Sequence, residues 1–225
     1  QTPNRGHALE IMRGLPHNVT TEMDLALWNT AQSIRQDPLA MSQLVNTPPA
    51  RLASDYLAGQ LPTTIQTAVE RFLLRYGMRG LAEIDLGRPR WRDDPTPVMQ
   101  TLQSYVRIDD AELAPDAVFR RGAARAEEVI DELAGALRSA PRGQFYSGLL
   151  RWMAKRVRAL AGVRESPKFF MVRVLGMLRQ MMLSAGAELV QAGELKSADD
   201  IFFLQLNELR GLAAGYQIDW PALVA

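Results

Sequence analysis

The chain has 225 residues and a formal net charge of +1, and 47% of its residues are hydrophobic, which is enough apolar material for a substantial core. It contains no cysteine, which excludes a disulfide framework and thiol chemistry. No apolar run approaches the roughly 20 residues needed to span a bilayer. The polar first residues do not resemble a signal peptide, so we expect a cytoplasmic protein without membrane contact.

The charges are spread unevenly along the chain. The segment from Arg138 to Arg179 holds ten basic residues and one acid, Glu165, so its net charge is +9 and that of the remainder is −8. Such asymmetry indicates either a basic face that meets an anionic partner, or basic helices that pair with acidic helices of the same domain. The charge pattern leaves both interpretations open.

Helical spacing of apolar residues dominates the first third of the chain. Thr20 or Thr21 is predicted to cap a first helix, which ends at Asp37-Pro38. The next helix is predicted to begin at residues 47–49, Thr-Pro-Pro, because proline is favoured in a first helical turn.

A further helix is predicted to open at Pro62 and to run to Tyr76, with Gly77 as a C-terminal glycine. About fifteen residues follow that are dense in Arg, Asp, Glu, Gly and Pro. They are too rich in specific, non-repeating side chains for a linker, so we expect a structured loop.

The second half also predicts helices. One starts at Thr96-Pro97, and a long one is capped by Asp116 and reaches about Arg138. After a break at residues 141–143, a basic helix covers roughly residues 144–160.

Another helix starts at Ser166-Pro167 and closes at Gly193, and Ser197 with Asp200 forms a capping box before the next apolar run. No strand alternation, hairpin turn or repeat is present. The predicted fold is all-α, a compact domain of about eight to ten helices that spans residues 1–225.

Common catalytic patterns are missing. The two histidines, His7 and His17, do not cluster with carboxylates, so we expect no metal site. There is no glycine-rich phosphate loop and no serine in a nucleophile elbow. The sequence therefore assigns no catalytic residue within this chain.

Four segments carry a family resemblance. Residues 72–95, FLLRYGMRGLAEIDLGRPRWRDDP, resemble the "YGHRG…EID…PRW.EDP" stretch of the rifampicin phosphotransferases and their relatives in the phosphoenolpyruvate synthase group. Residues 13–27, residues 164–172 with the "RE.PK" element, and residues 198–209 resemble further family segments in the same order. One departure is visible, since Met78 stands where the family pattern has histidine.

The resemblance implies that the chain is the later part of the substrate-binding region of a larger multidomain enzyme of antibiotic resistance. In that family, ATP and Mg²⁺ are used in an ATP-grasp domain, and a histidine on a mobile domain passes a phosphoryl group to a hydroxyl of a rifamycin antibiotic. Both domains are absent from this chain, as is the Thr-Ser-His motif of the phosphohistidine. The chain is thus expected to hold no cofactor and to be catalytically incomplete on its own, with a hydrophobic small molecule and those two domains as its partners.

Arg164 and Lys168 are the candidates for the phosphoryl path. They lie four residues apart around a predicted helix start, where two cations and the helix dipole can act on one anion, and the resemblance places functional basic residues at this element. The alternative is a salt bridge within the domain, to Glu165 or to the helix over residues 116–138.

Two other groups are singled out. A buried ion-pair network is expected to hold the charged loop in shape, with direct catalysis by the loop as the alternative. The charged members are Arg79, Glu83, Asp85, Arg88, Arg90 and Asp93, and Trp91 is expected to anchor the loop in the core. Three methionines of one helix suit a pocket for a large apolar ligand, or else an ordinary core; they are Met171, Met177 and Met181.

Two rival functions stay open. A related dikinase-type enzyme with another acceptor would have a similar helical region. A helical interaction module could instead use the basic segment to bind an acidic protein or nucleic acid. We expect no nucleic-acid partner, because the basic segment is not interleaved with recognition motifs.

Overall fold

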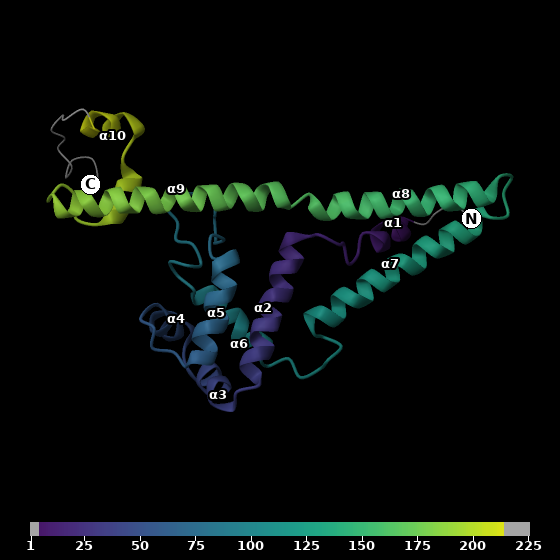
Figure 1. The fold of residues 1–225 in the computed structure, drawn as a ribbon, viewed down its shortest axis with the longest axis horizontal. Coiled ribbons are helices and arrows are strands. Elements are labelled where there is room, and N and C mark those ends of the chain that lie inside the picture. Colours follow the sequence, from purple (N-terminus) through teal and green to yellow (C-terminus); the bar gives the residue numbers. More distant parts are fainter. Residues whose placement is uncertain (1–4, 214–225) are drawn as a thin grey trace. The chain divides into compact units, whose positions relative to one another are not determined.

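The computed structural model describes residues 5–213, and within this range the chain forms ten α-helices, one short 3-10 helix and no strand, which confirms the all-α prediction (Figure 1). The helices are α1 (Arg5–Ile11), α2 (Val19–Arg35), α3 (Pro38–Asn46), α4 (Pro49–Leu57), α5 (Thr63–Tyr76), α6 (Thr96–Tyr105), α7 (Pro115–Leu137), α8 (Gly143–Val163), α9 (Ser166–Gln191), the 3-10 helix η1 (Ala198–Phe203) and α10 (Leu206–Ala213). None of them is both long and apolar enough for a bilayer crossing.

The chain divides into two compact units. Unit 1 comprises residues 1–74 and 96–169, and unit 2 comprises residues 75–95 and 170–225. The single domain expected from the sequence stays a prediction.

The core of unit 1 lies among helices α2 to α6, where α2 packs against α3 and α6, and α4 packs against α6. Apolar side chains at helical spacing bury one stripe of each helix. Fully enclosed side chains in this core include Ile34, Leu44, Leu52, Ile65, Val69, Met99, Leu102 and Val106. Burial of each such side chain stabilises the fold by about 1.5–3 kcal/mol relative to exposure, before ordering costs.

The helix starts correct two predicted caps. Asn18, and not Thr20 or Thr21, is the N-cap of α2, because its Oδ1 accepts hydrogen bonds at 3.0 Å from the backbone N–H groups of both threonines. Asp116 lies inside the first turn of α7 and pairs with Arg120, since Pro115 already occupies the first helical position.

Asp37-Pro38 separates two helices, and the second of them, α3, is missing from the sequence prediction. Asp37 is the N-cap of α3 and accepts from Leu39 N at 3.1 Å and Ala40 N at 3.2 Å. It also accepts a 2.7 Å hydrogen bond from the Thr64 hydroxyl, which is the main reason why the pKa of Asp37 is lowered. Asp37 thereby links α3 to the start of α5.

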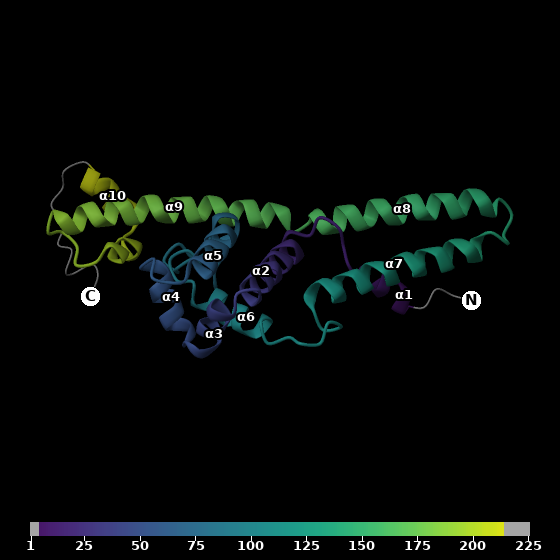
Figure 2. The same cartoon turned by 60° about the horizontal axis from the view of Figure 1, so that its bottom comes forward.

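Helices α7 and α8 of unit 1 form an antiparallel hairpin (Figure 2). The turn between them places Arg142 at φ 61°, in the left-handed region. On α8, small side chains face the rest of the unit, because the neighbouring backbone comes very close. A Cβ added to Gly162 would lie 1.8 Å from the Pro16 carbonyl oxygen.

Arg158 is a charged residue on this inward side of α8, and it is 5% exposed. Its guanidinium donates hydrogen bonds to the carbonyl oxygens of Ile11, Arg13 and Gly14, the last two at 3.0 Å. These carbonyls lie at the last residue of α1 and just after it, where helix carbonyls lack a helical partner. Arg158 therefore ties the α1–α2 connection to α8.

Unit 2 has a small core of Leu195, Ile201 and Leu204. Gly193, at φ 78°, lies two residues after the last residue of α9, where the sequence predicts a glycine that closes the helix. The predicted capping box of Ser197 and Asp200 is confirmed. The element that follows the box is a 3-10 helix.

Glycine also permits a close approach within unit 2. A Cβ on Gly186 would lie 2.3 Å from the Ala198 carbonyl oxygen. The backbone of η1 therefore packs directly on α9.

We predict that Gly162→Ala lowers the free energy of unfolding by roughly 2 kcal/mol, because the added methyl group collides with backbone that cannot yield cheaply. The matched control is Gly148→Ala on the same helix, where nothing lies within 4 Å of an added Cβ. That variant should leave stability unchanged or raise it by up to about 1 kcal/mol. Urea titration of both proteins by circular dichroism measures the difference, and equal midpoints would contradict the close approach.

Candidate functional site

The charged loop of residues 77–95, in unit 2, is closed by its own backbone. Trp91 N donates to Arg79 O at 2.7 Å, and Arg92 N donates to Gly77 O at 3.0 Å. The side chain of Trp91 is half-buried. The two ends of the loop are thus held side by side, which gives this segment a fixed shape.

One buried ion pair lies inside the loop. Arg79 Nε and Glu83 Oε2 are 2.7 Å apart, and both side chains are largely shielded from solvent. Glu83 also accepts a hydrogen bond from Gly80 N at 3.3 Å. By contrast, Arg88 and Asp85 are 3.8 Å apart and mostly exposed, so their pairing contributes little.

Arg90 is the most enclosed charged residue of the loop, with 1% exposure. Its three guanidinium nitrogens have no hydrogen-bond partner among the residues that the structure describes. Burial, followed by repulsion from Arg179, lowers the pKa of Arg90, while the nearby carboxylates of Glu83, Asp93 and Asp85 act in the opposite direction. The surroundings of Arg90 therefore disfavour its charged form on balance, and the three carboxylates offset this only in part.

Arg179 of α9 joins the loop to η1. Its Nε donates to Asp93 Oδ2 at 3.1 Å, its Nη1 to the Leu86 carbonyl oxygen at 2.6 Å, and its Nη2 to Asp199 Oδ1 at 3.2 Å. The guanidinium also lies 4.7 Å from the centre of the Phe202 ring. One side chain thus fixes three segments of unit 2.

Sequence reasoning treated Arg179 only as one member of the basic segment. A signal was available, because Arg179 follows Val172 and Gly176 at spacings of seven and three residues, on the stripe of α9 that is buried. An arginine in an otherwise apolar or small-residue stripe predicts a buried hub. Its partners, up to 93 residues away, could not be predicted from spacing.

Met78, the departure from the family pattern, packs on α9. A Cβ on Gly176 would lie 2.5 Å from the Met78 sulfur, so the side chain occupies the space that this glycine leaves. Arg92 Nη1 contacts the same sulfur at 3.9 Å. A thioether cannot transfer a proton, so position 78 contributes packing in this protein.

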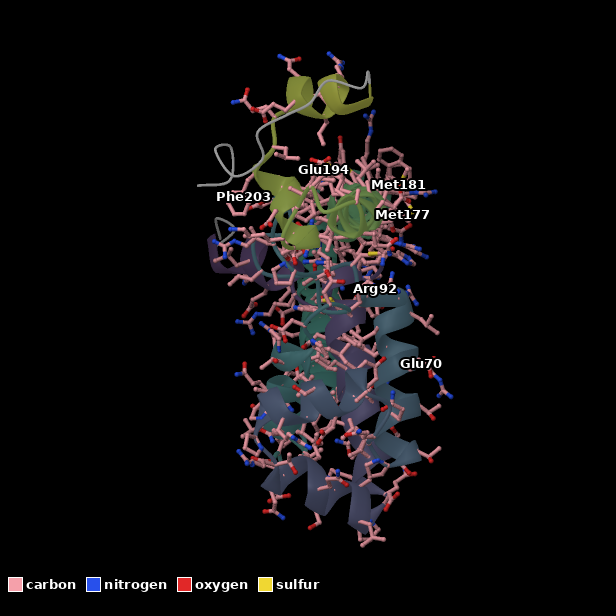
Figure 3. All side chains as sticks on the ribbon, turned by 90° about the vertical axis from the view of Figure 1, so that its left-hand side faces the viewer. Glu70, Arg92, Met177, Met181, Glu194 and Phe203 are labelled. Carbon is pink, nitrogen blue, oxygen red and sulfur yellow. The ribbon has the colours of Figure 1, made fainter. Side chains whose placement is uncertain are left out.

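The predicted pocket methionines lie on the opposite, exposed side of α9. Met171 and Met177 are 50% exposed and Met181 is 69% exposed, and Figure 3 shows Met177 and Met181 leaving the helix on the same side. They belong to a continuous exposed apolar stripe, which we name the α9 stripe; it consists of Phe170, Met171, Val174, Met177, Leu178 and Met181. These methionines do not fill the core of unit 2.

Arg164 and Lys168 lie in unit 1, on either side of the junction between α8 and α9, and both are exposed. Arg164 Nη2 is 3.4 Å from Glu165 Oε1, and its side chain is 82% exposed. An ion pair of this kind contributes little to stability. The Arg164 guanidinium is therefore still accessible to an anion.

A cleft of about 740 Å³ lies beside α7 in unit 1, next to the segment of residues 13–24. Its size is typical of small-molecule sites. Two of its arginines already pair with carboxylates, since Arg121 contacts Glu112 and Arg125 contacts Glu10 at 3.1 Å. None of the site residues predicted from the sequence lines this cleft.

Residues 5–213 contain no group of three or more histidine, aspartate or glutamate side chains that could hold a metal ion. The carboxylates of the charged loop are engaged by arginines or by backbone N–H groups instead.

Comparisons with known proteins agree on one family. The model of the rifampicin phosphotransferase fourth domain matches residues 1–165. The chain is 32% identical over 207 residues, or 91% of its length, to a rifampicin phosphotransferase of Streptomyces sviceus. It is 26% identical over 213 residues, or 95% of its length, to the rifampicin phosphotransferase of Bacillus subtilis. A prodigiosin synthesizing transferase of Serratia marcescens is 26% identical over an alignment of 232 positions, which covers 98% of this chain. The chain spans about a quarter of the length of these relatives, namely 23–24%.

We predict that Arg179→Met destabilises unit 2 by roughly 3 kcal/mol, because the substitution leaves two carboxylates and a carbonyl oxygen without their donor. Hydrogen exchange of the backbone amides in residues 77–95 should become faster. The matched control is Arg210→Met at an exposed position of α10, also in unit 2, which should change stability by less than about 0.5 kcal/mol. Unaltered exchange in the Arg179 variant would show that the loop keeps its shape without this residue.

Proposed function

We propose that this chain, which belongs to the rifampicin phosphotransferase family, forms part of the acceptor-binding region of an enzyme that phosphorylates a rifamycin-type antibiotic. In this proposal, the phosphoryl group comes from ATP by way of a phosphohistidine, and both lie in other parts of a longer polypeptide. The attacking hydroxyl belongs to the antibiotic, so this region supplies no nucleophile.

The observation that carries the proposal is the α9 stripe. Contiguous apolar surface on a protein is usually covered or functional, and thioethers adapt to large, irregular apolar ligands. The stripe is presented on a helix whose other side is fixed by Arg179, so the surface is rigid in its backbone and adaptable in its side chains. This combination suits an acceptor with a bulky apolar body.

Arg164 and Lys168 are assigned to the phosphoryl path. In this step the phosphohistidine P–N bond breaks, the hydroxyl oxygen of the ligand forms the new P–O bond, and the hydroxyl proton ends on the imidazole nitrogen that leaves. Negative charge on the transferred group needs nearby cations. Arg164 is exposed and only weakly paired, which supports this assignment. Neither residue needs to move a proton in this role.

A second candidate function differs from the first in the acceptor of the phosphoryl group. The prodigiosin synthesizing transferase aligns with nearly the whole of this chain, so a similar region occurs in a relative whose name indicates another product. A dikinase-type enzyme with a different apolar acceptor is therefore the alternative, and ligand binding decides between the two.

We predict that the chain binds rifampicin with a dissociation constant in the micromolar range, measured by isothermal titration calorimetry. Met177→Gln and Met181→Gln should each weaken binding about tenfold, because each places an amide where apolar contact is needed. The matched control is Leu206→Gln, which alters an exposed leucine of unit 2 outside the stripe. Binding that is equally tight in all variants would exclude the α9 stripe as the ligand surface, and no binding would favour the other acceptor.

We predict further that Arg164→Ala and Lys168→Ala in the full-length enzyme lower the phosphorylation rate by about 100-fold, while the unfolding midpoint stays the same. The effect should appear in kcat rather than in KM for the antibiotic, because these cations act on the transferred group. Arg138→Ala, at an exposed position of unit 1, serves as the control. Unchanged phosphorylation in both variants would remove these residues from the phosphoryl path.

A further inference from the structure

The outward side of α8, in unit 1, is a second apolar surface and is separate from the proposed ligand surface. Eight large side chains on this helix are between 39% and 73% exposed. We name this set the α8 stripe; it consists of Phe145, Tyr146, Leu149, Trp152, Met153, Val157, Leu160 and Val163. Monomeric proteins rarely expose so much contiguous apolar surface.

The inward side of the same helix explains why these bulky residues point outward. The buried positions of α8 are Gly143, Ser147, Arg158 and Gly162, and at two of them an added Cβ would lie within 2.3 Å of a carbonyl oxygen. Large side chains cannot be accommodated there. Turning the helix to bury its apolar stripe would break these close approaches, so the stripe must be covered by something else.

The charges on α8 restrict what that partner can be. The helix contains four arginines and lysines and no acidic residue. Arg156 lies within the stripe, one turn from both Trp152 and Leu160, and its guanidinium is 5.7 Å from the centre of the Trp152 ring. Lys155 borders the stripe and has no ion-pair partner in the described part of the chain. A partner that covers this surface must therefore supply both apolar side chains and carboxylates.

We propose that the α8 stripe binds an amphipathic helix whose apolar face is bordered by aspartate and glutamate, supplied by a neighbouring domain of the same polypeptide. The relatives are about four times as long as this chain, so such proteins contain further domains that can provide it. A second copy of α8 is disfavoured, because two stripes would bring Lys155 and Arg156 against their like-charged counterparts. A lipid bilayer is disfavoured because Arg156 lies within the apolar stripe and would have to enter hydrocarbon together with it, away from the headgroups. The inference goes beyond the proposed function, since it concerns neither the α9 stripe nor the phosphoryl path.

The test uses two synthetic helical peptides with the same leucine and alanine face, one bordered by glutamate and the other by lysine. Fluorescence anisotropy of the labelled peptides at low salt should show that the glutamate peptide binds this chain at least tenfold more tightly than the lysine peptide does. Trp152→Gln and Leu160→Gln should each weaken binding about tenfold. Leu39→Gln, at an exposed leucine of α3, is the matched control and should have no effect.

Arg156→Gln should reduce the difference between the two peptides without abolishing binding. The proposal is overturned if the glutamate peptide does not bind or if both peptides bind equally well. It is also overturned if Leu160→Gln abolishes dimer formation in sedimentation velocity, or abolishes binding to phosphatidylcholine–phosphatidylglycerol vesicles, because the stripe would then serve a second copy or a membrane. Circular dichroism of every variant establishes that the fold is retained.

Discussion

Burial of a guanidinium on each of the helices α8 and α9 is the constraint on which the rest of this structure depends. In unit 1, Arg158 of α8 donates hydrogen bonds to three carbonyl oxygens at and just after the end of α1. In unit 2, Arg179 of α9 binds a carbonyl oxygen and two carboxylates from separate segments. Arginine suits this task because its five donors are held in one plane and stay charged when buried. Removal of such a group leaves its acceptors unpaired, so a single substitution of either arginine is expected to destabilise the fold strongly.

These arginines also decide which side of each helix faces solvent. Both α8 and α9 carry large apolar side chains on the side opposite their buried arginine, and glycine on the side where neighbouring backbone approaches. Amphipathic helices usually turn their bulky apolar side inward. Here the order is reversed, because polar anchoring and close backbone contact hold the inward side. The apolar surface is thereby left for other molecules or domains.

Much of the helical order could be predicted from the sequence, since proline, glycine and capping residues mark most helix ends. The start at Ser166-Pro167 and the capping box at Ser197 are examples. Helix α3 was missed because Asp37-Pro38 indicates the end of one helix and the start of another equally well. Caps were misplaced by two residues where several capping-type side chains adjoin, as at Asn18 and Thr20. Local chemistry thus fixes that a helix begins, and the choice among neighbouring caps depends on backbone conformation.

The candidate site was less accessible to sequence reasoning. Periodicity reveals two stripes on α9 but does not say which of them faces the core, so the role of Met177 stayed open between pocket and filler. The hub at Arg179 joins residues that are far apart in sequence, such as Asp93 and Asp199. The family resemblance rests on motifs, and it is confirmed by the match over residues 1–165. The roles of individual residues remain proposals.

The methionines of unit 2 lie in two environments, one exposed and one packed, and these environments differ in how readily the sulfur is oxidised. Thioethers at half-exposed positions such as Met177 and Met181 are open to peroxide, which converts them into polar sulfoxides. Met78, whose sulfur occupies the space above Gly176, leaves no room for an added oxygen on the side that faces the helix. Under oxidising conditions, the outward side of α9 would therefore lose its apolar character while the packing of the loop against the helix persists.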